Sequence, residues 1–402
     1  MEIRLLDPLD AVDHESQLRL GSEAFGAPPY PAAAPPVPSA PPGGREVWGA
    51  FDGTALVARV AAHTYESWWH GNRVATCGIA GVTVAPEHRG TGLLQPLLDA
   101  TLDAAASRGE VVSTLYPTAS GIYRPFGYEL VTSFDTIEVG TDELAGVRPP
   151  AATRTRRAGV GDVPAVRALY DRWAAAQNGP LTRTGPRFAT GDAELLDEVT
   201  AITLAVDADD RVVGYATWDR GAGYDPTTSV LEVHDLLATT LDGYRALWRV
   251  LGSFSSVVGR IRLSSSGADA ARLVLPSSTW RVVDRHPYML RVSDPAGALS
   301  AVRLSVPGLT PTEVAFAVVG DRLGRADGCY RLALGSEPGV CERVDARDDV
   351  PVFTMQGLAL AFAGVQSCAN LRMLDHLGGP DTHDSVLDAV LSERPVHVRD
   401  YF

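Results

Sequence analysis

The sequence contains no lysine, so all 35 of its basic side chains are arginines. They stand against 49 carboxylates, which gives a net charge of −14. The arginines are spread over the whole length and form no stripe that would neutralise a run of phosphates. This balance argues against a nucleic-acid partner and favours a cationic one. The absence of lysine beside many alanines and glycines is typical of GC-rich coding and indicates no mechanism.

Cysteine and long hydrophobic runs are also scarce. The four cysteines, Cys77, Cys329, Cys341 and Cys368, include no CxxC pair, which argues against a zinc site and a disulfide framework. The histidines lack metal-ligand spacing, so no metal is expected. No window approaches about 18 uninterrupted apolar residues, and the N-terminus has no signal pattern. We therefore expect a cytoplasmic protein without a membrane span.

The length of 402 residues and an apolar content of 45% predict two or three domains of roughly 100–200 residues each. The pattern indicates an α/β (α+β) protein in three parts. Residues 1–145 read as a β-meander, helix, strand, short helix and strand, and residues 146–292 repeat this order after a proline-containing linker at 142–154. Residues 293–402 form a third, α+β part. The first two parts thus predict an internal repeat of architecture.

The expected elements follow from apolar spacing and turn residues. In the first part they are a helix ending near Phe25, strands within 47–60 and 74–84 with a turn at Asp52-Gly53, a helix over 93–106, a strand over 111–115, a helical turn over 122–126 and a strand over 128–139. In the second part they are helices over 163–176 and 241–251, with strands over 201–206, 212–218 and 230–238. In the third part they are strands in AVRLSV (301–306), EVAFAVVG and CYRLAL, helices in MQGLALAFAGV and over 385–392, and an extended tail RPVHVRDYF.

The run from Pro28 to Pro42, PPYPAAAPPVPSAPP, interrupts the first part. Its prolines cannot sustain a helix or donate a full strand ladder, so it predicts an extended, polyproline-like surface loop. A plain spacer and a lid over a pocket are both compatible with that composition.

Residues 82–95, VTVAPEHRGTGLLQ, are the most informative stretch. A strand ends at Val84, and Arg89-Gly90-Thr91-Gly92 then leads into a helix. Glycines let the backbone approach a ligand, and the free N–H groups of a helix start can hold a pyrophosphate, with Arg89 adding a charge-assisted contact. Taken alone, such a loop is also compatible with an ordinary turn.

This stretch resembles motif A of the GNAT superfamily of N-acetyltransferases, in which a V-x-V-x-P strand end precedes R/Q-x-x-G-x-G/A. Leu94 stands where Gly or Ala is usual, a departure that one branch with R-G-L-L shares. The resemblance implies acetyl-CoA as co-substrate, with the backbone of residues 82–84 on the pantetheine arm and residues 89–95 around the pyrophosphate. The implied acetyl-CoA-binding residues are Val82, Thr83, Val84, Arg89, Gly90, Thr91, Gly92, Leu93, Leu94, Gln95, Thr118 and Ala119.

A second motif, GIYRPFGY at residues 121–128, resembles the G-I-Y-x-x-F-G-Y signature of the Eis (enhanced intracellular survival) acetyltransferases. A chain of about 400 residues that ends in an aromatic residue is similar to that family as well. The stretch LLATTLDGYRAL of the second part contains only Gly243 and no Arg-Gly pair, so it lacks a phosphate loop. We therefore expect one catalytic centre per chain.

The Eis resemblance implies two catalytic groups. The Tyr123 hydroxyl, with an ordinary pKa near 10, would protonate the departing coenzyme A thiolate. The α-carboxylate of Phe402, with an ordinary pKa of about 3.3–3.7, would accept the amine proton through water. Without the resemblance, the sequence would favour Tyr123 as a packed aromatic residue beside Phe126 and Tyr128. The chain end at Phe402 would then be expected to be frayed, as chain ends often are.

The resemblance implies an N-acetyltransferase that acts on primary amines of a cationic acceptor, aminoglycoside-like or lysine-like. It also implies a sterol-carrier-like third domain that delivers the Phe402 carboxylate, and assembly into a homohexamer. The alternative is a non-catalytic acetyl-CoA or lipid-binding sensor on the same fold. Since the chain has no lysine, its own α-amino group is the only amine it could acetylate in itself.

Overall fold

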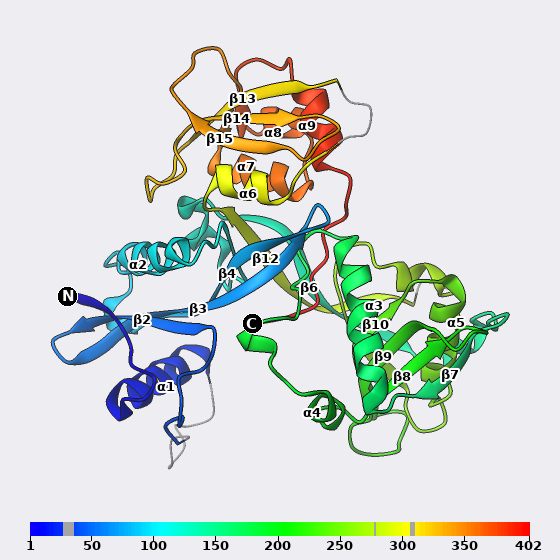
Figure 1. The fold of residues 1–402 in the computed structure, drawn as a ribbon. Helices are drawn as coiled ribbons and strands as arrows, with labels where there is room; N and C mark the ends of the chain where they lie inside the picture. Colours follow the sequence, from blue (N-terminus) through cyan, green and yellow to red (C-terminus); the bar gives the residue numbers. More distant parts are fainter. Residues whose placement is uncertain (27–35, 277–278, 306–309) are drawn as a thin grey trace.

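The computed structural model describes residues 1–26, 36–276, 279–305 and 310–402. In this part of the chain, one 12-stranded sheet runs through the first two units in the order β1-β2-β3-β4-β5-β12-β6-β11-β10-β9-β8-β7 (Figure 1). The strands of the first unit are β1 (Glu2–Leu5), β2 (Arg45–Asp52), β3 (Ala55–Trp69), β4 (Asn72–Val84), β5 (Val112–Leu115) and β6 (Glu129–Gly140). Those of the second are β7 (Arg154–Arg157), β8 (Ala201–Val206), β9 (Val212–Asp219), β10 (Val230–Ala238), β11 (Arg260–Ser265) and β12 (Arg281–Val292).

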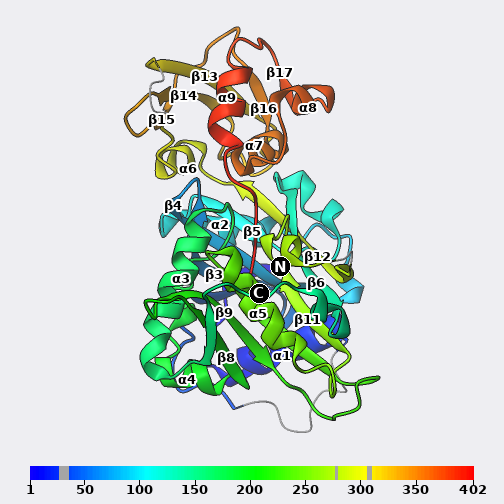
Figure 2. The ribbon, with the colours of Figure 1, turned by 90° about the vertical axis from the view of Figure 1, so that its right-hand side faces the viewer.

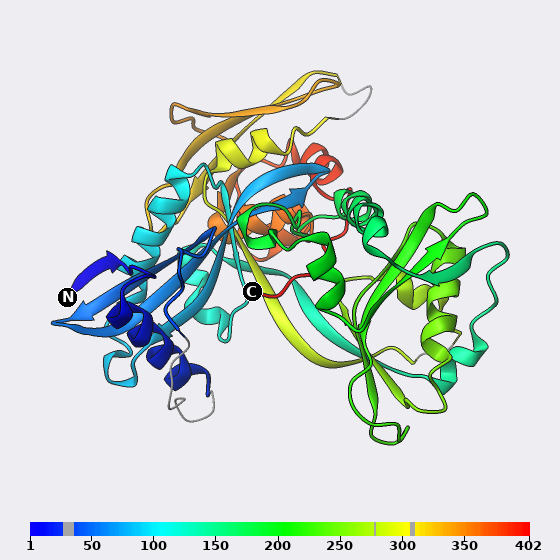
Figure 3. The ribbon, with the colours of Figure 1, turned by 60° about the horizontal axis from the view of Figure 1, so that its bottom comes forward.

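The two units repeat one topology. Each has a single parallel strand pair within the sheet, β4 with β5 and β10 with β11. Each unit also receives a strand from the other. Strand β12 of the second unit pairs with β5 of the first, and β6 of the first unit pairs with β11 of the second. This exchange makes the sheet continuous between the units (Figure 3). The internal repeat expected from the sequence is confirmed, whereas the exchange of strands was not foreseen; the boundaries at 145/146 and 292/293 stay a prediction.

The helices of these units are α1 (Ala11–Phe25), α2 (Leu94–Ser107), α3 (Val163–Ala175), α4 (Asp192–Asp197) and α5 (Leu241–Gly252). Apolar side chains of α2, such as Leu97 and Leu98, pack in one buried cluster with Cys77 and Ile79 of β4. On the opposite face, α1 approaches the sheet so closely that a Cβ on Gly21 would meet the Arg59 guanidinium at 2.5 Å. The first unit is therefore a sheet between two helical layers.

Residues 142–154, expected to be a linker, begin with a 3-10 turn at Asp142–Gly146.

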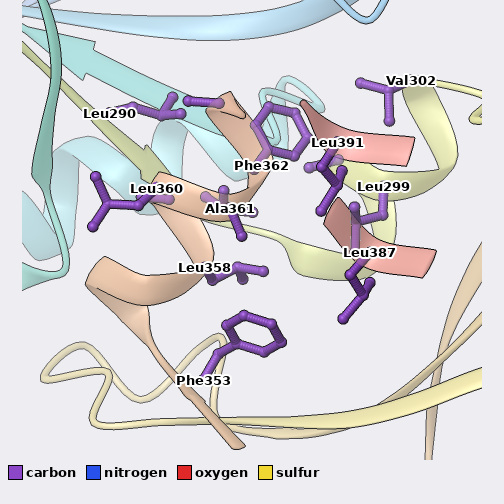
Figure 4. Packing of buried hydrophobic residues seen from close by; sticks show 14 of the residues in the cluster. Leu290, Leu299, Val302, Phe353, Leu358, Leu360, Ala361, Phe362, Leu387 and Leu391 are labelled. Atoms are coloured by element: carbon purple, nitrogen blue, oxygen red, sulfur yellow. The ribbon is translucent and has the colours of Figure 1, made fainter. Parts of the chain in front are cut away.

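The third part stands on the sheet as a separate layer (Figure 2). Its strands β13 (Thr312–Val319), β14 (Gly328–Leu334), β15 (Val340–Val344), β16 (Val352–Thr354) and β17 (Leu377–Gly378) form a sheet in the order β15-β14-β13-β16-β17. Its helices are α6 (Pro295–Ala301), α7 (Met355–Ala363), α8 (Cys368–Met373) and α9 (Asp384–Leu391). Leu358, Phe362 and Leu391 pack in its core (Figure 4).

The strand expected in AVRLSV is wrong. Ala301 ends α6, residues 302–305 form no strand, and Val306 lies outside the described residues. The Asp294 carboxylate accepts the N–H of Gly297 and Pro295 occupies the first turn, so a helix start precedes the apolar run. The alternating residues that suggested a strand therefore follow a capped helix.

The last nine residues run back from the third part to the junction of the first two units (Figures 1 and 2). Asn178 and Val396 form an isolated parallel bridge that begins this docking. The chain end thus lies far from the domain that carries it.

Within the described residues, no helix is long and apolar enough to cross a membrane. Most of the Pro28–Pro42 run lies outside the described residues, so its roles as spacer or lid stay untested.

Candidate active site

The sheet opens at the end of β4. Strands β4 and β5 pair in parallel from Thr76 with Val112 to Ile79 with Leu115, and no further pair is formed between them. Just beyond, β4 bulges: Ala80 pairs with Ala61 but Thr83 with Arg59, and Gly81 has φ +53°. A bulge bends the strand and redirects its backbone groups. Beyond Ile79, β4 therefore no longer pairs with β5, and the Gly81 carbonyl accepts the Thr83 hydroxyl at 3.1 Å.

The predicted phosphate loop follows this opening directly. Gly90 and Gly92 have φ of +78° and +84°, a region that favours glycine, and a Cβ at either would meet nothing within 4 Å. The loop is exposed, and α2 begins without a side-chain cap. Its first N–H groups are thus available to an anion. The Arg89 Nε donates only a long bond of 3.4 Å to the Val84 carbonyl.

The corresponding helix of the second unit is closed to such a ligand. The Thr240 side chain caps α5 by accepting the Gly243 N–H at 3.0 Å. A Cβ on Gly243 would already lie 3.1 Å from the Thr240 hydroxyl. Only the first unit therefore combines glycines in an open loop with an uncapped helix start.

An arginine that sequence analysis missed lies beside the loop. The Arg322 Nε donates to the Gln95 Oε1 at 2.9 Å, and its guanidinium lies 5.1 Å from the centre of the Phe126 ring. Arg322 belongs to the third part of the chain, between β13 and β14. No local motif marks it, because its position depends on how the third part packs on α2.

Tyr123 lies between two 3-10 turns, Ser120–Ile122 and Arg124–Phe126. It is 6% exposed and belongs to the buried cluster that contains Ile79 and Leu115, the last paired residues of β4 and β5. Burial raises the pKa of Tyr123 to about 12. Within the described part of the chain, its hydroxyl makes no side-chain hydrogen bond. The phenol is therefore protonated at neutral pH and free to donate. Thr118 and Ala119 lie exposed between β5 and these turns.

Phe402 lies on the other face of the same opening. Its ring centre is 5.0 Å from that of Tyr65 and 5.3 Å from that of Tyr116, the residue after β5. A Cβ on Gly78 would meet the Phe402 ring at 2.9 Å, so glycine in β4 makes room for the chain end. Tyr123 thus belongs to the buried cluster on the Ile79 side of β4, and Phe402 lies against Gly78 on the other side.

Buried polar contacts fix the tail. The Tyr116 hydroxyl donates to the Asp400 carbonyl at 2.7 Å, and the Arg399 guanidinium pairs with Asp269 at 2.6 Å. Arg183 joins Asp400, at 2.9 Å, to the buried Asp235. Burial raises the pKa of Asp400, although the Arg183 charge opposes this. The chain end is therefore held on both sides, by the first unit and by the second.

A cavity of about 480 Å³ adjoins the chain end, lined by His63, Tyr65, Arg187, His234 and Phe402 among others. A second cavity of about 600 Å³ extends into the second unit and shares Arg183, Phe188 and His234 with the first. Space for an acceptor thus lies between the two units. The second unit contributes walls to it, among them Arg183 and His234.

Comparison with known families identifies the fold. Residues 6–131 and residues 179–292 each match a model described as an acetyltransferase (GNAT) domain, and together they cover more than half of the chain. The chain belongs to the GNAT acetyltransferases. It is an acetyltransferase with two tandem GNAT domains, the second of which lacks the phosphate loop described above.

Relatives of this acetyltransferase include an uncharacterised N-acetyltransferase of Streptomyces avermitilis, 28% identical over 81% of this chain and 84% of that protein. N-acetyltransferase Eis of Mycobacterium tuberculosis is 29% identical over 56% of this chain and 57% of its own length. A GCN5-related N-acetyltransferase from Kribbella flavida has a similar structure, with a TM-score of 0.79, 26% identity and coverage of 100% and 98% of the two chains. Eis1 from Mycobacterium abscessus shares the fold at a TM-score of 0.72 and 22% identity, over the full length of both chains.

Proposed function

We propose that this acetyltransferase transfers the acetyl group of acetyl-CoA to a primary amine at one centre in the first unit. The observation that carries the proposal is the open Gly90–Gly92 loop before an uncapped α2, next to the part of β4 beyond Ile79 that no longer pairs with β5. Here the pantetheine arm would run along β4, and the pyrophosphate would meet the helix start, Arg89 and Arg322. The GNAT family membership favours this enzyme over the non-catalytic sensor.

In the proposed reaction, the amine nitrogen attacks the thioester carbonyl carbon. A C–N bond forms, the C–S bond breaks, and the Tyr123 hydroxyl gives its proton to the departing thiolate. The Phe402 α-carboxylate takes a proton from the amine through water. Proton exchange with solvent then restores both groups. Because an ionised carboxylate is a weak base, its larger contribution is to stabilise the positive charge that develops on the nitrogen.

The finer predictions from the sequence stay predictions at this stage. The acceptor would be cationic, aminoglycoside-like or lysine-like; the third part would have a sterol-carrier-like fold; and the chain would form a homohexamer in the cytoplasm. The net charge of −14 supports only the first of these.

The test is an acetylation assay with purified protein, acetyl-CoA and a panel of primary amines, with release of the coenzyme A thiol as readout. We expect turnover with some amines, its loss in a Tyr123→Phe variant, and its loss on deletion of Phe402 alone. Both variants should still bind acetyl-CoA. Absence of thiol release with every amine, despite acetyl-CoA binding, would refute the proposed function.

A further inference from the structure

The second unit has a cavity of its own on the sheet face that α3 covers. This cavity of about 600 Å³ lies among α3, α4 and strands β8–β10, and the surface that lines it is mostly apolar. The apolar and aromatic side chains that line it from the second unit are Val166, Tyr170, Leu195, Val199, Ile202 and Tyr215. Such a volume and lining are typical of sites for small molecules.

The charged side chains of this cavity are already engaged or lie in solvent. Six of them line it, and five have an acidic or basic partner: Arg183 with Asp235 and Asp400, Arg167 with Asp192, Asp171 with Arg73, and His234 with Asp219. The sixth, Glu198, is exposed at the end of α4. What remains for a ligand to cover is therefore the apolar part of the wall.

An aromatic path connects this cavity with the chain end. Phe188, in the 3-10 turn Pro186–Phe188, lines both this cavity and the cavity beside Phe402. Its ring centre is 5.9 Å from that of Tyr65, and the Tyr65 ring centre is 5.0 Å from that of Phe402. The two cavities therefore adjoin, and rings lie on the way from one to the other.

The cavity at the chain end is the polar part of this path. Asp400 and the terminal residue Phe402 both line it. Two of its arginines, Arg183 and Arg399, are paired with carboxylates, and the third, Arg187, is exposed. An ammonium group at the Phe402 α-carboxylate would thus have the apolar cavity of the second unit on its far side.

We propose that the cavity of the second unit binds an aliphatic chain of the acceptor, so that the acceptor is a primary amine with an apolar tail. The inference rests on the proposed function and narrows its substrate class. The amine would lie at the chain end, and its chain would pass Phe188 and leave water among α3, α4 and Ile202. The hydroxyls and further ammonium groups of an aminoglycoside would lose hydration against the same wall.

The kinetic test uses unbranched primary amines that differ only in chain length. n-Butylamine, n-hexylamine and n-octylamine carry the same ammonium group. Each methylene removed from water is worth a factor of about four in affinity. We therefore expect kcat/KM to rise at least about 30-fold from n-butylamine to n-octylamine, through KM. Kanamycin, a polyhydroxylated polycation, should be a poorer substrate than n-octylamine.

Two neighbouring leucines of α4 supply matched variants. Both are partly buried, but Leu195 lines the cavity, whereas Leu196 packs against the buried cluster that contains Val166. Leu195→Gln should lower kcat/KM for n-octylamine about tenfold, with kcat/KM for n-butylamine and KM for acetyl-CoA unchanged. Leu196→Gln, the control, should keep the ratio between the two amines at its value in the parent protein.

A flat dependence on chain length, a preference for kanamycin, or an equal change of that ratio in both leucine variants would overturn the proposal. A binding measurement separates these results from failure of the proposed function. In it, n-octanol, which has the chain but no amine, is titrated calorimetrically into protein saturated with coenzyme A. Binding that weakens at least tenfold in Leu195→Gln but not in Leu196→Gln supports the proposed cavity even without turnover, and absence of n-octanol binding to the parent protein refutes it.

Discussion

The Arg291 guanidinium and the Asp321 carboxylate form a fully buried ion pair between β12 and the third part of the chain. The Arg291 Nη2 lies 3.0 Å from each Asp321 oxygen, and both side chains have no solvent exposure. Arg291 also donates to the Phe126 carbonyl. The backbone N–H groups of Leu323, Arg325 and Ala326 complete the shell around Asp321. One ion pair thus joins the third part to the turn that carries Tyr123.

We expect Asp321→Asn to destabilise the protein by about 3–5 kcal/mol, because it leaves the Arg291 charge buried without its partner. The measurement is equilibrium unfolding in urea. A double variant, Arg291→Met with Asp321→Leu, should recover much of the loss, since it removes both charges. Arg331→Ala, which breaks only exposed pairs with Glu313 and Glu342, should cost about 0–1 kcal/mol. Equal costs for the buried and exposed pairs would contradict this assignment.

Gly78→Val tests the docking of the chain end. A side chain here would collide with the Tyr65 ring at 2.6 Å and the Phe402 ring at 2.9 Å. Displacement of a catalytic group by about 1 Å can cost on the order of 10²-fold in rate, so we expect a loss of that size in kcat, with KM for acetyl-CoA unchanged. Gly161→Val, where a Cβ would meet nothing within 4 Å, is the control. An active Gly78→Val enzyme would show that the tail position does not matter.

Gly92→Val tests the phosphate loop. The residue has φ +84°, where a β-branched side chain costs about 1–2 kcal/mol of backbone energy, and the new side chain would cover the helix start. We expect KM for acetyl-CoA to rise at least tenfold, measured by thiol release at saturating amine. Gly53→Val, at the β2–β3 turn with φ +58° and open space around it, carries a similar backbone cost away from the site. If both variants raised KM equally, the loop assignment would fail.

Local signals in the sequence predicted the elements that position the site. The strand before Val84, the helix after Gly92 and the short turns around Tyr123 all occur, because glycine, proline and apolar spacing act over a few residues. The signature glycine Gly127 has φ +82°, and a Cβ there would meet Met355 of the third part at 2.8 Å. The motif that contains Gly127 can be recognised in the sequence. The contact with Met355, which leaves no space for a Cβ at this position, is long-range and cannot be recognised there.

Long-range relationships could not be predicted in this way. The exchange of β6 and β12 between the units depends on strand pairing across more than 100 residues, and so does the placement of Arg322 and Arg187 beside two different parts of the site.

The pH dependence of stability follows from His397, which belongs to the docked tail and is 4% exposed. Burial, helped by the Arg399 charge, lowers its pKa to about 4 from an ordinary value of about 6.5. Between pH 4 and pH 6.5 the unfolded chain binds a proton at His397 that the folded protein does not bind. The contribution of His397 to the free energy of unfolding is therefore fully present above pH 6.5 and is lost as the pH falls toward 4.

We expect the His397→Asn substitution to remove this pH-dependent contribution to the free energy of unfolding. The difference in unfolding free energy between parent and variant should shrink by about 3 kcal/mol from pH 7 to pH 4, measured by urea unfolding at each pH. His234→Asn, a histidine substitution at a half-exposed side chain, is the control variant. A constant difference between parent and His397→Asn across this range would mean that His397 takes up its proton as readily in the folded protein as in the unfolded chain, and that the docked tail leaves this side chain accessible to water.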